Sequence, residues 1–127
     1  MAYLLDTQVL IWIFGEPEKL TTDMISIIKN PKNDLYVSLV SFWEMAVKIN
    51  IGKLALPVNL EEFMQETMDN DIKVIEVRAN HILGIVDMPL HHRDPFDRLI
   101  LSQSIFEGIP IISSDNQFKA YDVKLIT

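Results

Sequence analysis

The feature that most constrains the fold is an alternation of short, apolar, strand-like runs with longer segments of helical periodicity. The strand-like runs are YLL near the start, DLYVSLV from position 34, IKVIEV from 72, IPIIS from 109 and VKLI from 123. Between them, apolar residues recur three or four positions apart, as they do on one face of a helix. This order is typical of an α/β fold, and it predicts a mostly parallel central sheet of about four to five strands flanked by helices.

Capping and helix-breaking residues set the expected helix boundaries. Asn59 is a natural N-cap, Thr21 or Thr22 is expected to cap another helix, and Pro89 interrupts a third pattern. A residue before proline is disfavoured in the helical conformation, so helices are expected to end ahead of prolines. Helices are therefore expected over residues 8–15, 21–30, 41–52, 59–70 and 78–88, with a last one beginning at Pro95.

Size and composition predict a folded, single-domain protein covering residues 1–127. Hydrophobic residues make up 49% of the chain, which supports a real core and excludes disorder. No apolar run approaches the roughly 20 residues of a membrane span, so no membrane association is expected. The N-terminus has no basic leader and soon meets Asp6, unlike a signal peptide. Because cysteine is also absent, we expect a cytoplasmic protein without disulfides or thiolate-bound zinc.

Acidic residues follow the strand-like runs, at the edge where ligands collect in parallel α/β sheets. Asp6 closes the first run, Glu44 lies just past the second, and Asp115 ends IPIISSD. Asp97, in DPFD at the start of a helical pattern, is expected at the same edge. The net charge of −7 argues against broad nucleic-acid binding through a basic surface. A cluster of carboxylates around a cation is one possible origin of this charge.

Each of these acids also has a purely structural interpretation. Asp6 with Thr7 can cap the first helix, and Asp115 can form an ordinary turn. Ser41 and Glu44 have the spacing of a capping box, in which Glu44 reaches back to the Ser41 amide. Capping also explains DPFD well, with Asp94 as N-cap, Pro95 as the first helical residue and Asp97 as the third.

Taken together, however, the four acids need compensation. Two like charges about 4 Å apart cost about 4 kcal/mol at an effective dielectric near 20. A hard divalent cation such as Mg²⁺ or Mn²⁺, bound by carboxylates and water, removes this penalty. The spacing therefore predicts a metal.

The same segments resemble a known family. YLLDT, VSLVSFWEMAVKINIGKL, DPFDRLILSQSI and PIISSD are similar, in this order, to the motifs of PIN-domain proteins, above all the VapC-type toxins of bacterial and archaeal toxin–antitoxin pairs. The resemblance covers essentially the whole chain and implies a PIN-like three-layer sandwich. It assigns both catalysis and metal binding to Asp6, Glu44, Asp97 and Asp115, the family's acidic quartet.

Supporting residues follow from the same resemblance. The family's small hydroxyl after the first acid matches Thr7, and the hydroxyl two positions before the last acid matches Ser113. The chain has Ser113 and Ser114 where many relatives have threonine and a polar or basic residue. Three roles stay open for Asp94: a helix cap, a group supporting the metal ligands, or a further carboxylate near the metal.

The implied function is that of a Mg²⁺- or Mn²⁺-dependent endoribonuclease, the toxin of a toxin–antitoxin pair. The implied partners are an RNA substrate such as transfer or ribosomal RNA, a cognate antitoxin, and a second copy of the chain in a homodimer. RNA phosphates are expected to meet basic side chains that flank the acid-bearing helix starts: Lys48, Lys53, Arg93 and Arg98. Lys48 can instead pair with Glu44 four positions earlier, and the arginines can balance Asp94 and Asp97.

Other classes remain as alternatives. One is a PIN-like module that binds metal or RNA without cleaving it, and another is a metal-dependent phosphatase of small phosphoesters. A zinc site is disfavoured because His81 lies ten residues from His91 and no cysteine can complete it, so His91 and His92 are expected in a solvated loop. No G-x-S-x-G motif supports a serine hydrolase.

Overall fold

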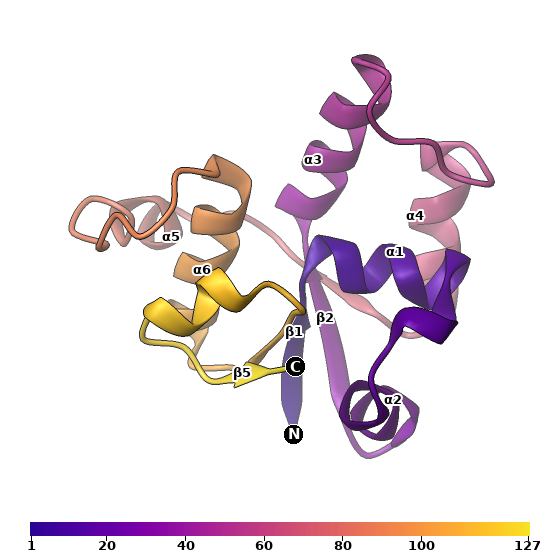
Figure 1. Ribbon diagram of the computed structural model, residues 1–127, viewed down its shortest axis with the longest axis horizontal. Helices are drawn as coiled ribbons and strands as arrows, with labels where there is room; N and C mark the ends of the chain where they lie inside the picture. Colours follow the sequence, from indigo (N-terminus) through magenta and orange to yellow (C-terminus); the bar gives the residue numbers. More distant parts are fainter.

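The computed structural model describes residues 1–127 and alternates strands with helices along most of the chain (Figure 1). Its elements are β1 (Ala2–Leu5), α1 (Thr7–Gly15), the 3₁₀ turn η1 (Pro17–Lys19), α2 (Thr22–Lys29), β2 (Asp34–Ser38), α3 (Leu39–Asn50), α4 (Leu60–Asp69), β3 (Lys73–Ile75), α5 (Ala79–Leu83), α6 (Pro95–Glu107), β4 (Ile111–Ile112), the 3₁₀ turn η2 (Asn116–Ala120) and β5 (Leu125–Ile126). None of the helices is both long and apolar enough to cross a bilayer.

All five strands form one parallel sheet in the order β3-β2-β1-β4-β5. This confirms the predicted α/β fold with a mostly parallel sheet of four to five strands. The chain leaves β1 toward β2 on one side and later returns to place β4 on the other side. The carboxyl ends of β1 and β4 are therefore neighbours, with Leu5 paired to Ile112. Such a reversal of strand order is where α/β sheets form their ligand clefts.

Helices cover both faces of the sheet, because successive side chains of a strand point to opposite sides. Tyr3 and Leu5 belong to a core of 11 buried residues shared with α1, α2, α3 and α4. Leu4, between them, belongs to a second core of seven buried residues that includes α6 and η2. Figure 1 shows the two helical groups on either side of the sheet, which gives the expected three layers.

Several helix boundaries agree with the sequence. Thr21 caps α2, its hydroxyl accepting a hydrogen bond from the Met24 amide at 3.3 Å. Asn59 caps α4 in the same manner, accepting from the Glu62 amide at 2.9 Å. In both cases the cap satisfies an amide that the helix itself cannot pair. Helix α1 ends at Gly15 as predicted.

Two helix predictions were wrong. Helix α3 begins at Leu39 rather than Ser41, because Ser38 ends strand β2 and also caps the helix, accepting from the Val40 amide at 3.0 Å. Helix α5 spans only Ala79–Leu83 instead of continuing to residue 88. Beyond Leu83 the chain forms turns. In this region the Arg98 guanidinium, rather than a helical amide, donates hydrogen bonds to the carbonyls of Met88 and Pro89.

Candidate active site

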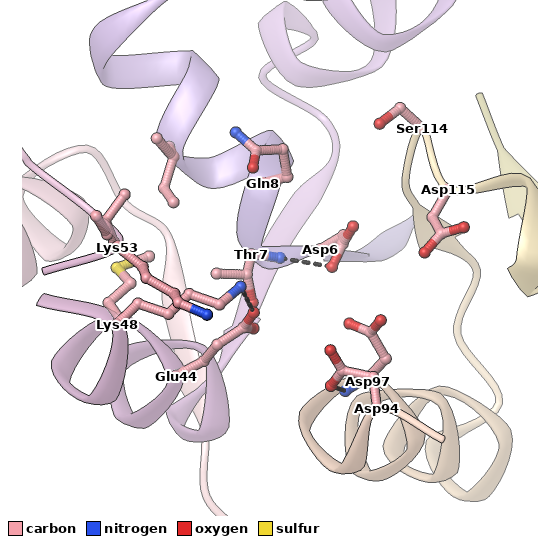
Figure 2. A pocket seen from close by; sticks show the side chains of 13 residues that line it. Asp6, Thr7, Gln8, Glu44, Lys48, Lys53, Asp94, Asp97, Ser114 and Asp115 are labelled. Atoms are coloured by element: carbon pink, nitrogen blue, oxygen red, sulfur yellow. Dashed lines mark hydrogen bonds and ion pairs between the residues drawn. The ribbon is translucent and has the colours of Figure 1, made fainter. Parts of the chain in front are cut away.

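A cleft of about 440 Å³ lies at the carboxyl ends of β1 and β4, at the reversal point of the sheet. Its walls come from α1, α3, the start of α6 and the loop after β4. Five carboxylates line it: Asp6, Glu44, Asp94, Asp97 and Asp115. Figure 2 shows them converging from these separate segments on one space. The fold thus brings together all four acids of the predicted quartet, with Asp94 beside them.

Asp6 is the best-anchored acid of the cleft. It follows β1 directly, caps α1 and is buried. One carboxylate oxygen accepts from the Thr7 amide at 2.8 Å, and the other accepts from the Ser113 hydroxyl, also at 2.8 Å. The pKa of Asp6 is raised to about 6, mainly by burial and to a smaller extent by the charges of Glu44 and Asp115, against the lowering effect of these two hydrogen bonds.

Asp97 is the third residue of α6, as predicted from DPFD. Asp94 caps this helix by accepting from the Asp97 amide at 3.0 Å, and Pro95 is the first helical residue. The cap fixes the first turn, so that the Asp97 side chain enters the cleft. Burial raises the pKa of Asp97 to about 8, and the surrounding acids, Asp6 first among them, contribute to the shift. Asp97 is therefore a carboxylate whose charge is poorly compensated.

Glu44 comes from the second turn of α3 and is only 4% exposed. The capping-box interpretation of Ser41 and Glu44 was wrong, because α3 has already begun by Ser41. The Ser41 hydroxyl instead accepts from Thr7 Oγ1 at 2.8 Å. Glu44 Oε2 pairs with Lys48 Nζ at 2.6 Å, as one interpretation of their spacing predicted. Its other oxygen, Oε1, is buried without a hydrogen-bond partner.

Asp115 lies in the loop beyond β4. The strand ends at Ile112 rather than reaching Asp115, and Asp115 caps η2 by accepting from the Gln117 amide at 2.9 Å. Its own amide donates to the Ser113 hydroxyl at 3.0 Å. Because Ser113 also donates to Asp6, one buried serine connects the acids that follow β1 and β4.

The basic residues divide into two groups. Lys48 and Lys53 line the cleft, and the bond to Glu44 raises the pKa of Lys48. Arg93 is exposed and lies outside the cleft lining. The expectation that Arg98 contacts phosphate does not fit the structure, since Arg98 is 8% exposed. Its guanidinium donates to the Pro89 carbonyl at 3.0 Å and to Tyr121 Oη at 3.2 Å, so it fastens the loop before α6.

His92 was missed by the sequence analysis, which expected a solvated loop. The side chain is 8% exposed and lies between Tyr121 and the cleft. Nδ1 is 2.7 Å from Tyr121 Oη, and Nε2 is 3.5 Å from Asp97 Oδ2. Its position two residues before DPFD was the available signal, but nothing in the sequence shows that Tyr121 covers it. His81 is buried elsewhere against Glu107.

The donor set suits a divalent cation bound through oxygen. Carboxylate oxygens and water are what Mg²⁺ and Mn²⁺ prefer, and Mg²⁺ usually retains several waters. The raised pKa values of Asp6 and Asp97 show negative charge that the protein leaves uncompensated, and Glu44 Oε1 is a buried oxygen without a hydrogen-bond partner. No three of the histidine, aspartate and glutamate side chains form a ready-made ligand set around one point. The oxygen donors of the cleft lining therefore fit such an ion only where water supplies the remaining ligands.

The fold and the cleft define a class of protein: an α/β domain with a carboxylate site at the reversal point of a parallel sheet. The sequence matches the PIN domain over residues 3–124, and the chain therefore belongs to the PIN-domain family. Among curated proteins it is similar to Ribonuclease VapC22 of Mycobacterium tuberculosis (strain ATCC 25618 / H37Rv), with 23% identity over 119 residues, covering 93% of this chain and 90% of that protein.

Solved structures of VapBC assemblies share the fold. The structure of VapBC2 from Rickettsia felis, bound to a DNA fragment from their promoter, matches with a TM-score of 0.73 and 17% identity over 99% of this chain and 98% of that one. DNA-bound VapBC from Salmonella typhimurium matches with a TM-score of 0.71 and 10% identity over 99% and 97% of the two chains. The resemblance to VapC-type toxins noted in the sequence thus extends to the fold.

Proposed function

We propose that this protein is a Mg²⁺- or Mn²⁺-dependent endoribonuclease and the toxin of a toxin–antitoxin pair. The observation that carries the proposal is the single cleft in which Asp6, Glu44, Asp97 and Asp115 meet. Membership of the PIN-domain family and the likeness to a protein named Ribonuclease VapC22 support the same conclusion.

A bound divalent ion supplies an activated water and neutralises charge that develops on the phosphoryl oxygens. Asp6 and Asp97 are proposed as direct ligands, since theirs are the carboxylates whose pKa values are raised. Glu44 and Asp115 act through water or orient the nucleophile. Ser113 and the Thr7 amide hold the two oxygens of Asp6, which fixes the direction of that carboxylate.

RNA binding needs local positive charge, because the cleft is acidic and the chain has a net charge of −7. Lys48 and Lys53 are the cationic side chains of the cleft lining and are proposed to contact the RNA backbone. Few phosphate contacts imply weak nonspecific binding with a shallow salt dependence. We propose transfer or ribosomal RNA as the substrate, in the cytoplasm.

The proposed protein partners are a cognate antitoxin and a second copy of the chain. Support for the antitoxin comes from the structural neighbours, which are VapBC assemblies. Apolar residues of α1 and α2 that could meet a partner are partly buried against the first core: Ile11, Ile13, Phe14, Ile27 and Ile28. The buried part of these side chains packs in the core of the domain, and their exposed part is proposed to contact the partner.

The test is RNA cleavage by purified protein free of antitoxin, with Mg²⁺, with Mn²⁺ and with EDTA. A double variant, Asp6→Asn with Asp97→Asn, is the matched control, since it removes two charges with little change in shape. We expect cleavage that needs the metal and is absent from the variant. RNA binding without cleavage would instead support a binding module, and hydrolysis of small phosphoesters but not RNA would support a phosphatase.

A further inference from the structure

A buried polar cluster behind the cleft connects the loop before α6 to the residue that follows η2. Tyr121 Oη is its centre, and this side chain is buried. Three N–H groups donate to that oxygen: the His91 amide at 3.2 Å, the His92 amide at 3.1 Å and Arg98 Nη1 at 3.2 Å. The His92 ring is the fourth neighbour, with Nδ1 at 2.7 Å.

Counting donors and acceptors at Tyr121 Oη fixes the role of the His92 ring. A phenol has one proton to donate, and its oxygen has two lone pairs, which three N–H donors already share, so no room is left for a fourth donor. The remaining short contact, to His92 Nδ1, is therefore the one in which Tyr121 donates its proton. Nδ1 is then an acceptor, and the proton of the neutral imidazole lies on Nε2.

The Nε2–H group of His92 is directed at the cleft without a partner. It is buried and makes no hydrogen bond, and Asp97 Oδ2 lies 3.5 Å away. A buried donor without a partner is unfavourable, and a shift of a few tenths of an ångström would satisfy it at this carboxylate. The imidazole is not needed to hold the loop before α6 against Tyr121, because the backbone amides of the loop and Arg98 already bond to Tyr121 Oη.

We propose that His92 is a positioning residue for Asp97: its Nε2–H holds Oδ2 of that carboxylate, so that Oδ1 is presented to the divalent ion. Tyr121 selects the tautomer that makes this possible. Hydrogen bonds of this kind, from neighbouring groups to metal-binding side chains, orient the ligand and tune its affinity. The role rests on the proposed function, because Asp97 is a metal ligand there.

The first experiment examines the wild-type protein without metal or RNA. A long-range ¹H–¹⁵N spectrum of the histidine rings reports which ring nitrogen carries the proton. We expect His92 to be protonated on Nε2, and Tyr121→Phe to populate both tautomers. A proton on Nδ1 in the wild type would overturn the proposal, whatever the protein does to RNA.

The second experiment compares His92→Phe with His92→Gln, using Mn²⁺ alone as the probe and then RNA cleavage. Phenylalanine fills the space but has no donor, whereas the glutamine amide offers N–H near the position of Nε2. We expect His92→Phe to weaken Mn²⁺ binding about tenfold and to lower kcat by about 10- to 100-fold, with KM within about twofold. His92→Gln should recover most of both losses, and His91→Gln, at the adjacent exposed position, should match the wild type.

The outcomes separate this role from the proposed function. RNA cleavage by a His92→Phe variant that binds Mn²⁺ like the wild type would overturn the role alone. A His92→Gln variant no better than His92→Phe would do the same, since the ring would then only fill space. A wild type that cleaves no RNA, but whose Mn²⁺ affinity falls in His92→Phe and returns in His92→Gln, would overturn the nuclease and retain the role. No Mn²⁺ binding at all would overturn both.

Discussion

Glu44 and Asp97 face the same cleft from opposite walls, yet the protein treats their charges differently. Glu44, on α3, has its own cation: Lys48, one helical turn later, lies 2.6 Å from Oε2. Asp97, on α6, lies among other acids, and its pKa is raised to about 8 by burial and by those neighbours. His92 Nε2 lies 3.5 Å from Asp97 Oδ2 and makes no hydrogen bond.

The difference shows where the cleft lacks positive charge. The wall formed by α3 is neutralised within the chain, whereas the space between Asp6 and Asp97 is not. An exogenous cation therefore gains most by binding on the Asp6–Asp97 side, where it removes repulsion that folding has imposed. Without metal, folding brings these carboxylates together although their charges repel one another.

The largest expected effect comes from removing the uncompensated acid. Asp97→Asn should lower the rate of RNA cleavage in Mn²⁺ by about 10³-fold, or about 4 kcal/mol in activation free energy, because the carboxylate proposed as a direct metal ligand is lost. Single-turnover cleavage of a labelled RNA measures this. Asp23→Asn, at an exposed acid in the first turn of α2, is the control and should cleave normally. Retained activity in Asp97→Asn would place the metal elsewhere.

The second effect is a fall in stability with rising pH in EDTA. The pKa of Asp97 is about 8 and that of Asp6 about 6 in the folded protein, whereas both lie near 4 in the unfolded chain. The folded state therefore binds more protons across this range, and the free energy of unfolding should drop by several kcal/mol between pH 5 and pH 8, most of it from Asp97. Urea unfolding at several pH values measures the drop.

The Asp97→Asn variant tests whether Asp97 causes the loss of stability at the upper end of this pH range. Asp97→Asn should flatten the curve between about pH 6 and pH 8, and at pH 8 it should be more stable than the wild type without metal. Added Mn²⁺ should stabilise the wild type more at pH 8 than at pH 6. Equal stability of the wild type at pH 5 and pH 8 in EDTA would contradict the account of an uncompensated charge.

Removing Lys48, the cation on the α3 wall, should lower the stability of the metal-free protein, whereas Asp97→Asn should raise it at pH 8. The change should also be smaller. Lys48→Met leaves the buried Glu44 without its partner, so the metal-free protein should lose about 1 kcal/mol of stability at pH 7; the 43% exposure of the lysine side chain keeps the loss modest. Lys53→Met, at a cleft lysine outside this ion pair, should change stability little. A stabilising effect of Lys48→Met would remove the contrast between the two walls.

The smallest effect concerns RNA affinity. Lys53→Ala should weaken RNA binding about threefold and reduce the slope of log affinity against log salt by about one, as expected for one lost phosphate contact. Arg93→Ala should change binding less, because Arg93 lies outside the cleft lining. Fluorescence anisotropy with a labelled RNA in EDTA, over a series of salt concentrations, measures both. A larger effect from Arg93 would extend the RNA path beyond the cleft.

The sequence by itself determined the layout of the fold and the identity of the acids. Alternating strand-like and helical segments dictated a parallel α/β sheet, because parallel strands need crossover connections. Acids placed after β1, early in α3 and at the start of α6 had to share one edge of that sheet. Asp94 as the cap of α6 was also readable, since an N-cap acts within four residues of its own position.

The tertiary structure alone decided how these acids are compensated. The hydrogen bond from Ser113 to Asp6 spans 107 residues, and the cluster joining His92 and Arg98 to Tyr121 spans more than 20, so no local pattern could reveal either. The same holds for Arg98, whose charge suggested phosphate binding until the packing of the preceding loop used its donors. Burial and long-range hydrogen bonding set the pKa values and side-chain orientations of the site, and both depend on what the rest of the chain places against each residue.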